Sequence, residues 1–248
     1  MLPPPRSFAS ADEPIGVRAS GGFAVIDVET TGLDPVNDRI IECAIVTLDP
    51  TGAPLEEWST LLAIPGRRRL GAQHIHGIER RMLEGAPSFA EVSGAIATRI
   101  SGRVLVGHVL SFDIDNLRAE FARLGATLPD LSGLCTRDLA RLCWPDARHH
   151  LAACCEYAAI STDHLHSALG DARATATLLR YFLDNKTTVE LPEQVAPFCT
   201  AFTKSSFVAP RALDARVTAH RSAIGRVVGA ARASVETVRQ RLLRRGDQ

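Results

Sequence analysis

Residues 23–35 read FAVIDVETTGLDP, a β-branched, apolar run that ends in turn-forming residues. Such a run predicts a buried strand over 23–28, because β-branched and aromatic side chains suit a sheet and the Gly and Pro that follow end it. Side chains two residues apart point to the same face of a strand. Asp27 and Glu29 would therefore place two carboxylates side by side at the end of this strand.

The segments that follow predict a mixed sheet. Residues 39–48 and 55–64 have strand-like composition, and DPTG between them is a typical hairpin turn, so the domain would open with two antiparallel hairpins. Two short apolar strands are expected further on, at 103–106 and 131–135. Helical spacing is found at 78–84, 88–100, 113–124, 136–143, 151–158 and 171–183. Strands first, and then strands alternating with helices, predict an α/β domain.

Charge is unevenly distributed along the 248 residues. The 28 Lys and Arg balance 28 Asp and Glu, which excludes a wholly basic protein that coats nucleic acid. Residues 186–248 nevertheless carry a net charge of +6, and residues 1–185 a net charge of −6. An acidic body with a basic tail is predicted, and the tail would either contact nucleic-acid phosphates or dock as a helix on the body or on a partner.

Composition also sets the expected boundaries. Residues 1–19, rich in Pro and Ser, predict a disordered segment, and 20–185 a single folded domain. Residues 186–210 resemble a linker, and 211–248 have the apolar spacing of a basic amphipathic helical tail. No stretch approaches the roughly 18 apolar residues of a membrane span, and six cysteines form no CxxC pair. We expect a cytoplasmic protein with reduced thiols and no membrane partner.

Two further motifs carry acids. In GHVLSFDIDNL (107–117) a strand runs into a helix near Asp113, and in HSALGDA (166–172) His166 precedes Asp171 across a glycine-containing loop. A histidine so placed suits general-base chemistry on water. Local alternatives remain: Ser111 or Asp113 would serve as a helix N-cap worth about 1 kcal/mol, and the acids of the first strand would simply face solvent.

Together with IDVETTGLDP (26–35), these motifs closely resemble the DEDDh group of 3′→5′ exonucleases, the DnaQ-like family that includes the proofreading epsilon subunit of bacterial DNA polymerase III. The resemblance covers about residues 22–184, with the motifs in the family's order. HIHGIERRML (74–83) and HHLAACCEYAAI (149–160) also look like family segments. One departure is Val109, which stands where the family often has Asn.

The resemblance implies a ribonuclease-H-like fold, in which a mixed five-stranded sheet has helices on both sides. It implies two Mg²⁺ or Mn²⁺ ions. Asp27, Glu29 and Asp171 would hold one ion, Asp27 would bridge to the second, and Asp113 would act near that second ion. His166 would be the general base.

Substrate contacts are implied less directly. Thr30, Gly32 and Leu33 would receive the terminal nucleotide, Phe112 would line its pocket, and His76 would approach a sugar or phosphate. Each has a plain structural alternative: a simple turn for the first three, a core position for the phenylalanine, and a surface loop for the histidine.

The resemblance implies a 3′→5′ exodeoxyribonuclease that releases nucleoside 5′-monophosphates from single-stranded DNA or a frayed 3′ end, in proofreading or repair. A 3′→5′ exoribonuclease is the alternative within the superfamily, since the discriminating contact is to a 2′-hydroxyl. The other alternative is a non-catalytic replication or repair adaptor, against which the five intact catalytic positions argue. A DNA polymerase or sliding clamp is a possible partner. QVAPF (194–198) only faintly resembles a clamp-binding peptide, because Pro197 occupies an apolar position.

Overall fold

The computed structural model describes residues 21–66, 69–71, 73–128, 133–163 and 165–185. The expected disordered segment, linker and basic tail lie outside these residues and stay predictions. Within the described part of the chain, no helix has both the length and the apolar character that crossing a bilayer requires.

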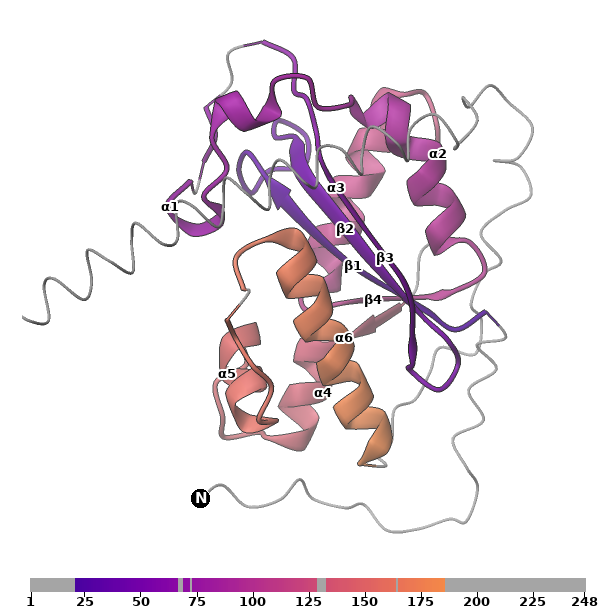
Figure 1. Ribbon diagram of the computed structural model, residues 1–248, viewed down its shortest axis with the longest axis vertical. Helices are drawn as coiled ribbons and strands as arrows, with labels where there is room; N and C mark the ends of the chain where they lie inside the picture. Colours follow the sequence, from indigo (N-terminus) through magenta and orange to yellow (C-terminus); the bar gives the residue numbers. More distant parts are fainter. Residues whose placement is uncertain (1–20, 67–68, 72, 129–132, 164, 186–248) are drawn as a thin grey trace, which may run out of the picture. The chain divides into compact units, whose positions relative to one another are not determined.

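Five strands form one mixed sheet in the order β3–β2–β1–β4–β5 (Figure 1). The first strand pairs antiparallel with β2 and parallel with β4, which confirms the expected mixed sheet and its antiparallel opening. The third strand ends earlier than predicted, because Ala63 leaves the sheet edge and pairs with Ser88. The strands are β1 Phe23–Thr30, β2 Ile40–Leu48, β3 Pro54–Leu61, β4 Val104–Gly107 and β5 Gly133–Cys135.

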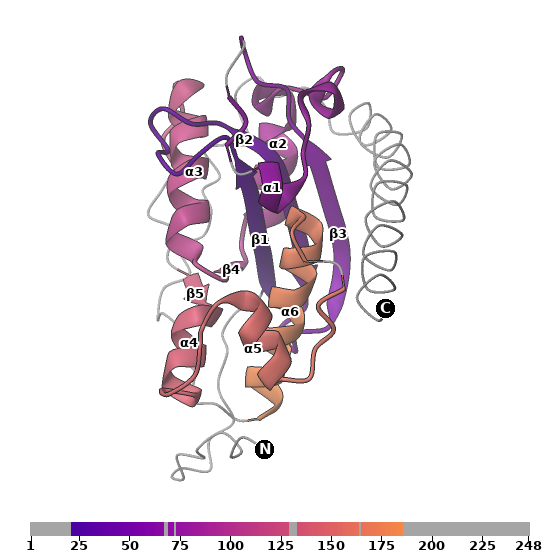
Figure 2. The ribbon, with the colours of Figure 1, turned by 90° about the vertical axis from the view of Figure 1, so that its left-hand side faces the viewer.

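Helices cover both faces of the sheet (Figure 2). Helix α6 Ala168–Asp184 packs on β1 and β2, with α4 Thr136–Cys143 and α5 Leu151–Tyr157 beside it. Helices α2 Phe89–Ile100 and α3 Leu110–Arg123 lie against the sheet away from α6, joined by an edge-to-face contact between Phe89 and Phe121 at 5.2 Å.

The prediction of one helix over 78–84 is wrong. The structure has a short helix α1 Gln73–His76 and a 3₁₀-helix η1 Arg80–Leu83 instead. Gly77 adopts a φ of 68° and Glu79 is extended, so the chain leaves the helical region between the two segments.

The face of the sheet under α6 is apolar at one end and acidic at the other. Because side chains alternate along a strand, the same positions that fill the core continue into the acids. Along β1 the series is Phe23, Val25, Asp27 and Glu29, and along β2 it is Leu48, Val46, Ala44 and Glu42. Glu29 lies directly opposite Glu42 in the strand register. The pattern that builds the core therefore also aligns three carboxylates.

Helix α6 begins three residues before the predicted start at residue 171. Ser167 is its N-cap, and its side-chain oxygen accepts the Gly170 N–H at 3.2 Å. A glycine in the first turn weakens the helical pattern in the sequence, which hides the true start. Asp171 is thereby placed within the first turn, where a carboxylate is favoured by the helix dipole.

Helix α3 also begins one turn before the predicted start at residue 113. Leu110 is buried and stands four residues before Ile114, so the apolar stripe extends further back than expected. Val109 precedes the helix, with no capping hydrogen bond from its side chain. Ser111 and Asp113 lie inside the first turn, so the alternative that either one caps the helix is wrong.

A buried ion pair fixes the loop that follows β1 to helix α3. Glu120, 2% exposed, accepts two hydrogen bonds from the Arg39 guanidinium at 2.6 and 2.8 Å and one from the Ile40 N–H at 3.2 Å. Arg123 lies 3.3 Å from the same carboxylate. One terminal nitrogen of Arg123 also donates to the carbonyl oxygens of Pro35, Val36 and Asp38, at 2.7, 2.9 and 3.0 Å.

Glu120→Ala should lower the free energy of unfolding by about 3 kcal/mol, because it leaves the partly buried Arg39 charge without its carboxylate. Urea denaturation of the two proteins measures the difference. Asp138→Asn is the matched control, since the Asp138–Arg141 pair is exposed and such pairs contribute roughly 0–1 kcal/mol. Equal losses in the two variants would contradict the assignment of Glu120 as a stabilising anchor.

Candidate active site

Three carboxylates from two elements meet at the acidic end of the sheet. Asp27 and Glu29 come from β1 and Asp171 from the first turn of α6, and one oxygen of each lies within 4.8 Å of the other two. Carboxylate oxygens are the hard ligands that Mg²⁺ and Mn²⁺ prefer. The donor set therefore fits a divalent cation of this kind.

Asp113 approaches the same end of β1 from α3. Its side chain is buried, and Oδ1 accepts the Val28 N–H at 3.2 Å. Gly107, at the end of β4, provides the space: a Cβ there would lie 2.9 Å from Asp113 Oδ2 and 3.1 Å from Leu110 Cα. Asp113 is outside the group of three carboxylates, yet its charge contributes to the raised pKa of Asp27.

His166 is exposed and lies in a left-handed turn with a φ of 73°. Its backbone N–H donates to Asp171 Oδ1 at 3.1 Å, so one oxygen of this carboxylate is held by the turn. Histidine is among the few non-glycine residues that adopt this conformation with some frequency. The turn thus connects the proposed base directly to one of the three clustered acids.

Burial and mutual repulsion raise the pKa values of these acids. The pKa of Asp27 lies well above its usual range because of burial and then because of Asp113 and Asp171. Burial raises the pKa of Glu29 to about 8, and the charges of Glu42 and Asp171 add to the effect. Without a cation the cluster retains protons near neutral pH, and a bound divalent cation would reverse this preference.

Glu42 is a further acid of the site that the sequence did not single out. It is 8% exposed on β2, and Oε2 accepts the Ala168 N–H at 3.1 Å. Burial raises its pKa to about 7, although the hydrogen bond from Ala168 acts in the opposite direction. A single acid within the otherwise apolar strand sequence IIECAIV was the available signal, because Glu is almost never fully buried unless paired.

The loop after β1 holds the first group of expected substrate residues. Thr30 is buried and its hydroxyl donates to the Gly32 carbonyl oxygen at 2.5 Å. A Cβ on Gly32 would lie 2.4 Å from an Asp38 carboxylate oxygen, so a larger residue here would displace the Asp38 side chain. Leu33 is 86% exposed at the tip of the loop. The alternative of a simple turn therefore explains Thr30 and Gly32, and leaves Leu33 without a packing role.

His76 and Phe112 are the other two expected substrate residues, and only His76 is fully buried. His76 is buried, with Nε2 donating to the Gly71 carbonyl at 2.8 Å and Nδ1 accepting the Ile78 N–H at 2.9 Å. Both ring nitrogens are thus engaged by the backbone, and the ring is not the surface-loop group that the alternative described. Gly71 in turn donates to the Thr31 carbonyl at 2.9 Å, which joins this segment to the loop after β1. Phe112 is half-buried, beside Asp113.

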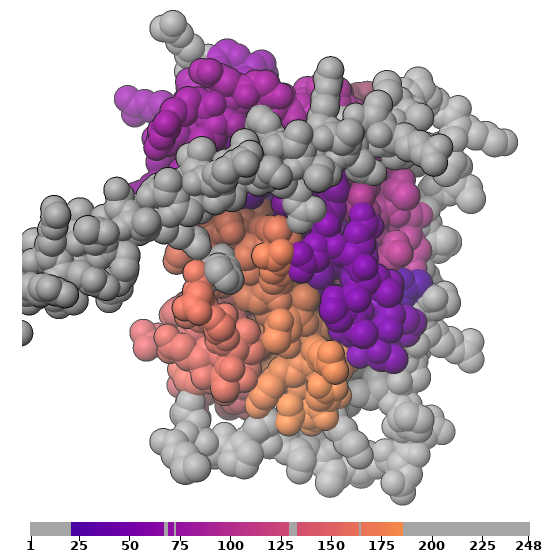
Figure 3. Space-filling view, in the orientation of Figure 1, coloured from indigo at the N-terminus to yellow at the C-terminus, as the bar shows by residue number. Residues whose placement is uncertain are grey.

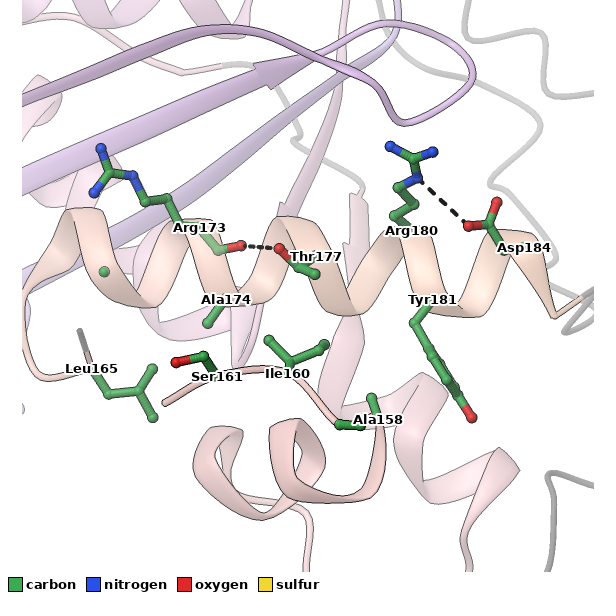
Figure 4. A pocket seen from close by; sticks show the side chains of 12 residues that line it. Ala158, Ile160, Ser161, Leu165, Arg173, Ala174, Thr177, Arg180, Tyr181 and Asp184 are labelled. Carbon is green, nitrogen blue, oxygen red and sulfur yellow. Dashed lines mark hydrogen bonds and ion pairs between the residues drawn. The ribbon is translucent and has the colours of Figure 1, made fainter. Parts of the chain in front are cut away.

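A hollow of about 580 Å³ lies between α6 and residues 158–161 and 165, on the face where α5 and α6 are neighbours (Figure 3). Arg173 and Arg180 project from the same side of α6, opposite Ile160 and Ser161 (Figure 4). Arg173 is paired with Glu57 and Arg180 with Asp184, so the arginines face acidic partners. None of the five expected catalytic residues lines this hollow, which makes the acidic cluster the stronger candidate site.

A mixed sheet with helices on both faces, and carboxylates from β1, α3 and α6 gathered near a histidine, define a ribonuclease-H-like α/β protein of the nuclease class. The chain belongs to the exonuclease family RNase_T, whose profile matches residues 24–179. The resemblance to DnaQ-like exonucleases found in the sequence is thereby confirmed, and with it the fold class.

Curated relatives agree with this family. Identity is 33% over 172 residues to the PolC-type DNA polymerase III of Lacticaseibacillus paracasei, covering 68% of this chain and 12% of that protein. The 3′-5′ exonuclease DinG of Bacillus subtilis is 29% identical over 164 residues, which cover 65% of this chain and 18% of that protein. The DNA polymerase III subunit epsilon of Buchnera aphidicola is 30% identical over 159 residues, which cover 60% of this chain and 68% of that protein. The chain spans about a tenth of the length of its PolC-type relatives.

Solved structures show the same fold. Exonuclease X in complex with 5′-overhanging duplex DNA is 26% identical, with a TM-score of 0.52, and the match covers 68% of this chain and 94% of that one. Escherichia coli exonuclease I in complex with a dT13 oligonucleotide is 20% identical, with a TM-score of 0.59 and coverage of 66% and 41%. The second likeness shows the fold alone.

Metal-free protein should lose stability as the pH rises from about 5 to 8. Burial raises the pKa of Glu29 in the folded protein from 4.5 to about 8, so folding favours the protonated carboxyl group. The contribution of this group to stability is fully present below pH 4.5 and is lost as the pH rises through 8. Glu29→Gln should remove roughly 1–3 kcal/mol of this decline, allowing for solvent screening. Urea unfolding in chelator at several pH values measures it, and identical slopes for both proteins would contradict the prediction.

Proposed function

We propose that this chain is a metal-dependent 3′→5′ exodeoxyribonuclease. It acts in the cytoplasm in proofreading or repair, and removes nucleoside 5′-monophosphates from single-stranded DNA or a frayed 3′ end. The observation that carries the proposal is the convergence of Asp27, Glu29 and Asp171 within 4.8 Å, beside the turn that presents His166. The names of the relatives, two of them DNA polymerase III proteins and one a 3′-5′ exonuclease, support DNA as substrate and this polarity.

In this proposal the acids would hold two Mg²⁺ or Mn²⁺ ions. Asp27, Glu29 and Asp171 would hold one ion, and Asp27 and Asp113 would serve the other. When bound, such a pair of ions stabilises the attacking and leaving oxygens of an in-line displacement at phosphorus. The fixed hydrogen bond from Val28 to Asp113 keeps that side chain oriented before any substrate arrives.

His166 takes the proton from the attacking water. Its side chain is exposed at the edge of the cluster, where water has access, and its backbone is fixed through the N–H that donates to Asp171.

The loop after β1 receives the terminal nucleotide in this proposal. Leu33, exposed at its tip, contacts the base, while Thr30 and Gly32 shape the backbone that approaches the strand. Phe112 contributes the side of the pocket next to Asp113. His76 acts through the backbone of Gly71 instead of touching a sugar or phosphate, because both of its ring nitrogens are engaged.

Association with a DNA polymerase or a sliding clamp completes the proposal. Its support is the occurrence of related sequences within proteins named DNA polymerase III.

The proposal is tested with oligonucleotides labelled at the 5′ or the 3′ end, as single-stranded DNA and as RNA, with Mg²⁺, Mn²⁺ or a chelator. A 5′-labelled DNA strand should shorten one nucleotide at a time, a 3′ label should appear at once as mononucleotide, and chelation should stop both. Faster degradation of RNA would favour the exoribonuclease. Absence of degradation with either metal would contradict the proposal.

Asp27→Asn should abolish exonuclease activity with either metal without unfolding the domain. The substitution keeps the side chain's shape and removes one of several crowded negative charges, so the thermal midpoint of the metal-free protein should hold or rise. Activity is measured on the labelled strand and stability by thermal unfolding in chelator. Undiminished turnover with Mg²⁺ would exclude Asp27 as a metal ligand.

His166→Ala should slow turnover by about 10²–10⁴-fold, the usual contribution of a general base. Metal affinity and strand affinity should change little, because the imidazole is exposed and the hydrogen bond to Asp171 comes from the backbone N–H of His166. A variant that keeps the wild-type rate would show that another group accepts the proton.

A further inference from the structure

We infer that Glu42 is a positioning residue for His166: its buried carboxylate fixes the start of helix α6 by accepting the Ala168 N–H. The inference deepens the proposed function and rests on it for the role of His166. Glu42 itself contacts neither a substrate group nor the water in this assignment. It acts on His166 through the backbone that joins Ala168 to His166.

Glu42 is placed for this role by the strand register. It lies on the α6 face of β2, opposite Glu29 of β1, and continues the line of core residues that ends at Ala44. With 8% of its surface exposed, it has no freedom to turn toward solvent. A buried carboxylate among other acids is costly unless a donor satisfies it, and the Ala168 N–H at 3.1 Å is that donor.

The first turn of α6 needs such an acceptor. The first N–H groups of a helix have no partner within the helix, and a side chain must satisfy them if they are buried. The Ser167 side chain is occupied by the Gly170 N–H, whereas Ala168 is fully buried and donates to Glu42, 126 residues earlier in the chain. A long-range contact therefore ties the start of α6 to the sheet.

The turn that precedes this anchor in the chain contains the proposed base, His166. His166 stands two residues before Ala168, in the left-handed conformation, and its N–H is held by Asp171 at 3.1 Å. The turn is thus fixed from both sides, by Glu42 at Ala168 and by Asp171 at His166. Removal of one support would let the turn rotate, and a displacement of about 1 Å can cost 10²-fold in rate.

The contact also separates Glu42 from the metal-binding acids. The carboxylate oxygens that gather within 4.8 Å belong to Asp27, Glu29 and Asp171, and Glu42 is not among them. Its Oε2 is directed to the Ala168 N–H. The required property of Glu42 is therefore an acceptor oxygen at this place, which an amide provides as well as a carboxylate does.

Two variants of nearly equal shape isolate that property. Glu42→Gln keeps an acceptor and removes the charge, whereas Glu42→Met fills the space with neither. We expect the Gln variant to keep kcat within about threefold of the wild type and the Met variant to lose at least about tenfold, with KM unchanged in both. Glu56→Gln, an exposed acid on β3 paired with Arg99, is the control and should not alter kcat.

A double-mutant cycle identifies the residue through which Glu42 acts. In a His166→Ala background the kcat ratio between the Gln and Met variants should fall to about one, because coupled residues are not additive. Amide hydrogen exchange of the metal-free protein gives a readout that needs no activity. Ala168 and His166 should exchange faster in the Met variant and at the wild-type rate in the Gln variant.

The outcomes separate the two proposals. If the wild-type protein degrades no strand, the proposed function is wrong. The amide exchange rates still test whether Glu42 anchors the start of α6. Equal exchange in the Gln and Met variants would overturn the role of Glu42 whatever the activity. An undiminished kcat ratio in the His166→Ala background would also overturn it, because Glu42 would then act on another group of the site.

Discussion

Burial of several carboxylates together at the end of one sheet face is the constraint on which this site depends. Loss of solvation, and then the charges of acidic neighbours such as Asp171, raise the pKa values of Asp27, Glu29 and Glu42 above the ordinary range of carboxyl groups. Such crowding opposes folding in the absence of a cation. The apolar end of the same face, packed under α4, α5 and α6, supplies the compensating stability. One surface of the sheet thus serves for both core and chemistry.

Backbone N–H groups hold three of the acids in place. Val28 donates to Asp113, His166 to Asp171 and Ala168 to Glu42, so each of these carboxylates has a fixed donor from a different element. Within the described residues no backbone N–H is found to donate to Asp27 or Glu29 in this way, and these are the acids of β1 on which a cation would act most directly.

The sequence predicted the fold and brought the main acids together, because both follow from simple periodicities. Alternation along 23–28 set Asp27 and Glu29 on one face, and the structure confirms this placement. Glu42 could not be recognised in the same way, since its importance comes from a register with Glu29 and a hydrogen bond to a residue 126 positions away. The first turn of α6 was missed because a cap and a long-range anchor, not amphipathic spacing, determine where that helix begins. The first turn of α3 was missed although buried Leu110 continues the apolar stripe of the helix. His76 shows the converse, since a loop histidine chosen for a substrate contact has both ring nitrogens engaged by backbone.

The two anchors of the molecule differ in a way that separates stability from catalysis. Glu120 is surrounded by the cations Arg39 and Arg123, so its charge is compensated and its loss should act on folding. Glu42 lies among other acids and has only a neutral N–H as donor, so its removal relieves repulsion while it releases the turn that carries His166. A buried acid with cationic partners is therefore expected to stabilise this domain, whereas a buried acid with acidic neighbours is retained for the geometry it imposes. The loop after β1 and the start of α6 are each held by one of these two kinds of anchor.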